Sequence, residues 1–113
     1  MAERGARTRA PRGREAEREG RRLALVSVFE ADFGQRTATA ALARQIEETE
    51  APPATVELAS AIVRAVVARR DSIDETIERI APAYPVVGLA RIDRSLLRSA
   101  LGEVLHCPAT PVR

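Results

Sequence analysis

The chain has 113 residues, enough for one domain with a modest core, and 45% of them are apolar. Only 3% are aromatic, so the core must be built from Leu, Val, Ile and Ala, which favours a helix bundle over a sheet sandwich. The single cysteine, Cys107, excludes an internal disulfide and a CxxC metal or redox motif.

The charge is unevenly distributed along the chain. Residues 1–22 hold eight Arg and four Glu, a net charge of +4, while the remainder holds ten Arg and twelve acidic residues, a net charge of −2. All basic residues are Arg, which reflects genome composition more than function. No apolar run approaches the roughly 20 residues that span a bilayer, and no secretory signal is recognisable. The sequence therefore predicts a protein of the reducing cytoplasm.

In chain order, residues 1–13 contain Gly, Pro and Arg with almost no large apolar residue, which predicts a flexible basic arm. Residues 14–113 read as one helical domain. Its first helix ends at Gly34, and one of its faces collects large apolar residues at helical spacing. These are Leu25, Val26, Phe29 and Phe33.

Four further helical segments are expected. Thr37 is placed to cap the second, which the Pro52-Pro53 pair closes. The third runs through Leu58–Val66, and Ser72 with Glu75 has the spacing of a capping box at the start of the fourth. That helix ends at Pro82 and Pro85. Beyond Gly88, an apolar stripe marks the fifth, which stops near Pro108: Leu89, Ile92, Leu96, Ala100, Leu101 and Val104. The predicted fold class is all-α.

No catalytic motif is evident. His106 and Cys107 are the only residues of their types, and one pair does not make a zinc site, so a helix-end position explains His106 better. Helix capping explains Ser72 without a nucleophilic role. A Gly-rich phosphate loop, an HExxH motif and a paired-carboxylate motif are all missing from the sequence. We therefore expect a binding protein that is not an enzyme and needs no cofactor or metal.

Two stretches resemble the NusB family. Residues 21–32, RRLALVSVFEAD, resemble its opening helix, where arginines lead into an Ala/Leu-rich run that ends in an aromatic. Residues 90–105, ARIDRSLLRSALGEVL, are similar to its most recognisable helix, in which an acidic and a basic residue precede Leu-Arg and Glu-Leu. Residues 63–85 fit the central helices and their Pro-bearing connection. The likeness runs from about residue 18 to the end of the chain.

The resemblance implies an all-α bundle with an N-terminal subdomain and a second subdomain. It also implies binding of the boxA element of nascent RNA together with ribosomal protein NusE, and action on the RNA polymerase elongation complex with other Nus factors. The chain stops at CPATPVR, where typical members continue into two further helices, so we expect an incomplete second subdomain and an apolar stripe with reduced cover. Gly102 stands where the family usually has an aromatic.

The same resemblance supplies candidate residues. Arg18, Arg21 and Arg22 fall where the family has its N-terminal RNA-binding arginines; Arg14 is a further RNA-binding candidate, adding non-specific attraction. The alternative for all four is a solvated helix face beside a tail.

Phe29 and Asp93 match positions that the family uses at the NusE interface. By spacing alone, Phe29 belongs equally to the core, and Asp93 could form an intrahelical pair with Arg94 or Arg98. Two other functions remain open: an RNA-positioning module of an rRNA cytosine methyltransferase, and a helical adaptor that binds protein and ignores RNA.

Overall fold

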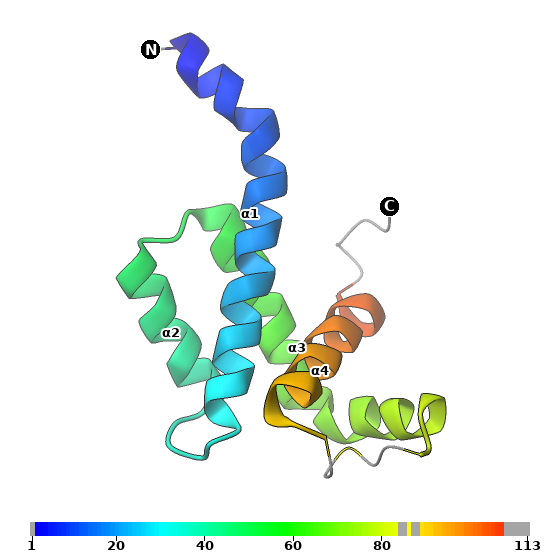
Figure 1. Ribbon diagram of the computed structural model, residues 1–113. Helices are drawn as coiled ribbons and strands as arrows, with labels where there is room; N and C mark the ends of the chain where they lie inside the picture. Colours follow the sequence, from blue (N-terminus) through cyan, green and yellow to red (C-terminus); the bar gives the residue numbers. More distant parts are fainter. Residues whose placement is uncertain (1, 84–85, 87–88, 108–113) are drawn as a thin grey trace.

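The computed structural model describes the backbone of residues 2–83, 86 and 89–107, and the side chains of that set from Gly13 onward. This part of the chain contains no strand and forms four helices: α1 (Ala2–Ala31), α2 (Ala38–Thr49), α3 (Pro53–Ile80) and α4 (Arg91–His106). α1 lies along α3, α2 packs mainly on α1, and α4 packs mainly on α3 (Figure 1). The all-α prediction is confirmed.

The basic arm expected over residues 1–13 falls on the first part of α1. The backbone is helical from Ala2, and this end of α1 extends beyond the other helices (Figure 1). The side chains before Gly13 lie outside the described residues, as do Pro85, Gly88 and Pro108, which were expected to mark helix ends. The mobility of the arm stays a prediction.

The turns around α2 form as the local sequence predicts. Gly34 ends the first helix with a φ of 81°, a left-handed conformation that glycine adopts without steric cost. The Thr37 hydroxyl accepts a hydrogen bond from the N–H of Ala40 at 3.0 Å and so caps α2. Pro53 occupies the first turn of α3, where its missing N–H would have no helical partner in any case.

The third and fourth predicted helices are one helix with a kink. Arg69 has non-helical angles within α3 (φ −123°, ψ 23°), and the helix changes direction along its length (Figure 1). The expected capping box at Ser72 is wrong, because the Ser72 hydroxyl donates a hydrogen bond to the Arg69 carbonyl at 3.3 Å. The segment boundary therefore exists, but a backbone distortion produces it, and Ser72 does not act as an N-cap. α3 ends at Ile80, before Pro82, as predicted.

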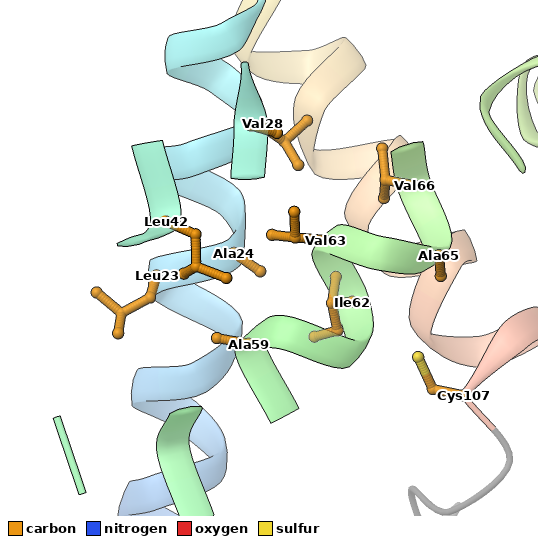
Figure 2. Close-up of a cluster of buried hydrophobic side chains, with 11 residues drawn as sticks. Leu23, Ala24, Val28, Leu42, Ala59, Ile62, Val63, Ala65, Val66 and Cys107 are labelled. Carbon is orange, nitrogen blue, oxygen red and sulfur yellow. The ribbon is translucent and has the colours of Figure 1, made fainter. Parts of the chain in front are cut away.

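The main hydrophobic cluster lies between α1, α2 and α3, where Ala24, Val28, Leu42 and Val63 point toward one another (Figure 2). A smaller cluster of Ile73, Ile77 and Val86 lies beyond the kink, with Leu89 and Leu101 packed against it.

The predicted core face of α1 is wrong. In its C-terminal half the buried residues are Leu23, Ala24, Ser27 and Val28, whereas Phe33, just after the helix, is exposed. Two features explain the difference: the buried Ser27 hydroxyl is satisfied by the carbonyl of Leu23 at 2.8 Å, and small side chains such as Ala24 let α1 approach α3 closely.

α4 turns small and polar residues inward and apolar ones outward. Its buried residues are Ser95, Ser99, Gly102 and Glu103. At Gly102, an added Cβ would lie 3.0 Å from the Cγ2 of Val66, so α3 and α4 approach closely where an aromatic side chain was the family expectation. The outer face of α4, which we define by its exposed apolar residues, comprises Ile92, Leu96, Leu97, Val104 and Leu105.

The thiol of Cys107 provides a test of the packing after α4. The residue is buried and lies beside Ile62 and Ala65 (Figure 2). Burial raises the pKa of this thiol above its ordinary value. Because the thiolate is the nucleophile, iodoacetamide should alkylate Cys107 at neutral pH more slowly than it alkylates the urea-unfolded chain, as followed by mass spectrometry. Equal rates in the two states would contradict this packing.

Candidate nucleic-acid interface

The four candidate arginines lie along one face of α1. Arg14, Arg18, Arg21 and Arg22 are spaced at i, i+4, i+7 and i+8, which places them on the same side of a helix, and all four are exposed. The opposite side of this segment is buried and includes Ala16, the glycine at position 20 and Leu23. We call the four residues the arginine face of α1.

The start of α3 anchors this segment of α1. A Cβ added to Gly20 would lie 3.2 Å from both the Leu58 Cβ and the Thr55 carbonyl oxygen, so the two helices touch closely here. The Thr55 hydroxyl also donates a hydrogen bond to the Ala16 carbonyl at 3.2 Å. The arginine face therefore has a fixed base, because its backbone is held by packing on α3.

The arginines of this face differ in what they already bind. The guanidinium groups of Arg14 and Arg18 make no ion pair or hydrogen bond among the described residues. Arg22 forms an exposed pair with Glu19, with Nη2–Oε2 at 2.6 Å. Hydrogen bonding within this pair raises the pKa of Arg22 and lowers that of Glu19. Arg14 and Arg18 are thus the guanidinium groups most available to a phosphate.

Arg21 connects the arginine face to α4. Its Nε lies 2.9 Å and 3.0 Å from the two Glu103 carboxylate oxygens, and its Nη2 lies 2.8 Å from Oε2. The Glu103 side chain is only 11% exposed, and its hydrogen bonds raise the pKa of Arg21. The sequence places these two residues 82 positions apart and gives no local signal of their pairing. Arg21 therefore has a structural role besides its candidate role in RNA binding.

Phe29 lies at the far end of α1, in a small aromatic cluster. It is half-buried, outside the main hydrophobic cluster, and its ring meets that of Phe33 edge to face with centroids 5.1 Å apart. The guanidinium carbon of Arg91, at the start of α4, lies 4.5 Å from the Phe33 ring centroid. Sequence reasoning missed Arg91, because only the packing of α4 brings it to this ring.

Asp93 follows in the first turn of α4 and is exposed. The alternative of an intrahelical pair is wrong. Arg94 binds Asp32, the residue that follows α1, with Nη2–Oδ2 at 2.6 Å, and Arg98 binds Asp74 of α3, with Nη2–Oδ2 at 2.8 Å. These pairs leave the Asp93 carboxylate without an ion pair among the described residues, at the end of α4 that carries Arg91.

Two other kinds of site are not found in the part of the chain that the structure describes. No group of three or more His, Cys, Asp or Glu side chains in the described ranges could hold a metal ion. None of the helices described combines the length and the apolar character that crossing a membrane requires.

The described chain is thus a small all-helical protein that presents an arginine-lined helix face, with an aromatic cluster at the other end of the same helix. Comparison with family models gives a match to the NusB family over residues 18–113. The chain belongs to the NusB family.

Curated relatives agree with this assignment. The chain is 34% identical over 96 residues to the transcription antitermination protein NusB of Dehalococcoides mccartyi strain CBDB1, which covers 85% of this chain and 67% of that protein. It is 36% identical over 95 residues to the protein of the same name from Heliobacterium modesticaldum, covering 84% of this chain and 46% of the relative. For Salinispora tropica the identity is 36% over 92 residues, with 80% and 68% covered. No solved structure matches the chain.

Proposed function

We propose that this chain is an RNA-binding transcription antitermination factor. It binds the boxA element of nascent ribosomal RNA in the cytoplasm together with ribosomal protein NusE, and acts on the RNA polymerase elongation complex with other Nus factors. The names of the relatives, transcription antitermination proteins rather than enzymes, support this role.

The observation that carries the proposal is the pair of exposed guanidinium groups of Arg14 and Arg18, on a helix segment held against α3 by the close contact at Gly20. Arginine neutralises phosphates and stacks on unpaired bases, which suits a single-stranded RNA. Arg22 and Arg21 extend the same face. Because Glu19 and Glu103 already bind them, we expect these two to contribute less than Arg14 and Arg18 per residue.

The partner side of the proposal rests on the other end of α1. Phe29 lies near the end of α1, and Asp93 lies near the start of α4. Two contacts join these helix ends: Arg91 packs on the Phe33 ring, and Arg94 binds Asp32. An aromatic cluster, together with an exposed carboxylate that has no ion pair among the described residues, fits a protein surface that offers an apolar patch and a cation. We propose that NusE contacts this region while the arginine face contacts RNA.

A titration of the protein with boxA RNA and a scrambled RNA, each with and without NusE, tests the role. The Arg14→Ala/Arg18→Ala variant should bind boxA RNA more weakly and with a flatter salt dependence. Removing one arginine–phosphate interaction with a single strand reduces the slope of log K against log salt by about 0.7. Arg64→Ala/Arg79→Ala is the control, since it removes the same charge from exposed positions on α3.

Three results distinguish the remaining hypotheses. Equal affinity for boxA and scrambled RNA, both with and without NusE, would refute the antitermination role. Binding of NusE without any RNA binding would favour the protein-binding adaptor. Finding that the DNA downstream of this coding sequence encodes a Rossmann-like catalytic domain would favour the methyltransferase module.

A further inference from the structure

A second basic region lies where the turn between α1 and α2 faces the kink of α3. The two segments enclose a cleft with a volume of about 960 Å³. Its lining includes three arginines, Arg36 from the turn and Arg69 and Arg70 from the kink, against one acidic residue, Asp71. The cleft belongs to neither the arginine face of α1 nor the aromatic cluster.

The kink in α3 lies at the cleft and contributes two neighbouring arginines to its lining. Consecutive residues of a regular helix point about 100° apart, so two neighbouring arginines seldom serve one small site. At Arg69 the backbone leaves helical geometry, and both Arg69 and Arg70 line the cleft. The net charge of its lining side chains is +2, from three arginines and one aspartate.

These guanidinium groups are not committed to partners within the described part of the chain. Arg69 and Arg70 are exposed and form no ion pair there. Arg36 has one weak pair, with its Nε 3.8 Å from an oxygen of Glu30, and Glu30 is held mainly by Arg44. Exposed arginines without partners hold phosphate readily, because the guanidinium fork matches two phosphate oxygens.

We propose that the cleft lined by Arg36, Arg69 and Arg70 is a second phosphate-binding site for the single-stranded RNA that the arginine face of α1 binds. This inference rests on the proposed function. Val67 and Ala68 give the cleft an apolar part beside its charges, so that a sugar or base edge can pack next to the bound phosphate. The cleft recognises the RNA backbone and does not read its sequence.

The spacing of the two sites sets a length requirement. Arg18 lies 13 residues before the end of α1 at Ala31, which lines the cleft. At 1.5 Å per residue the separation along the helix is about 20 Å. At 3.4 Å per nucleotide in a stacked strand, about six nucleotides cover that distance. An RNA shorter than this can occupy one site only.

The decisive experiment compares Arg69→Ala/Arg70→Ala with the control Arg64→Ala/Arg79→Ala, which removes the same charge from the same helix. We expect the cleft variant to bind boxA RNA and scrambled RNA more weakly by the same factor, about two- to fivefold per arginine. This is the contribution of an exposed ion pair to affinity. The effect should disappear with RNAs shorter than the separation. Asp71→Asn should strengthen binding, because it removes the one negative charge of the lining.

The outcomes separate this inference from the proposed function. If Arg14→Ala/Arg18→Ala weakens RNA binding while the cleft variant matches its control, the cleft proposal is overturned and the role of the chain stands. If the cleft variant loses affinity for NusE alone, the cleft binds protein and the proposal is equally overturned. If wild-type protein binds no RNA, both fail together. A urea titration of each variant shows that its fold is retained.

Discussion

Replacing Asp32 with alanine should lower the free energy of unfolding by about 3 kcal/mol, the scale for removing one partner of a buried ion pair. The Asp32 carboxylate lies between two arginines of α4. Its Oδ2 is 2.6 Å from Arg94 Nη2, and its Oδ1 is 3.8 Å from Arg98 Nη1. All three side chains are less than a fifth exposed. The substitution therefore removes the carboxylate that both arginines share, in a largely buried position.

Asp93→Ala is the matched control, since it removes the same group from an exposed position that has no ion pair among the described residues. Urea unfolding followed by circular dichroism measures both variants, and the denaturant dependence should be unchanged if only stability changes. Equal stability of the two variants would show that the Asp32 pairs do not hold α4 in place.

Leu23→Ala should also be strongly destabilising, by about 2–5 kcal/mol. Leu23 is fully buried in the main hydrophobic cluster, so its truncation removes apolar packing and leaves a cavity. The control is the same truncation at Leu97, on the outer face of α4, where the side chain is 40% exposed. That change should cost less, about 1 kcal/mol, because part of this side chain is already in contact with water.

Each of the two leucine variants has an outcome that would contradict the structure. A large loss of stability in Leu97→Ala would mean that another surface covers the outer face of α4 in solution. A small loss in Leu23→Ala would contradict the packing of α1 on α2 and α3. The same urea titration measures both, because each variant retains every charged group.

The sequence predicted those features that depend only on residues close together along the chain. The αL glycine at position 34, the Thr37 cap and the proline pair at the start of α3 are local signals, and all formed as predicted. The core face of α1 was not predictable in this way. Several sides of that helix carry apolar residues. Which side is buried depends on which residues are small enough for α3 to pack closely against them.

The candidate site shows the same division. The family resemblance supplied the four candidate arginines, and their spacing puts them on one face of α1, because that depends only on the helical period. Which of them are engaged depends on residues far along the chain, such as Glu103 for Arg21. The cleft residues Arg36 and Arg69 are 33 positions apart in the sequence, and only the folded kink of α3 brings them to one cavity.

The fork between Arg21 and Glu103 has a consequence for any mutational survey of this surface. A guanidinium has five N–H donors, and Glu103 engages those at Nε and Nη2, so the Nη1 edge remains for a phosphate. One side chain can thus bridge helix α4 and a transcript at the same time. Under the proposed function, Arg21→Ala would therefore lower both the stability of the domain and its affinity for RNA, whereas alanine at Arg14 and Arg18 would lower the affinity alone.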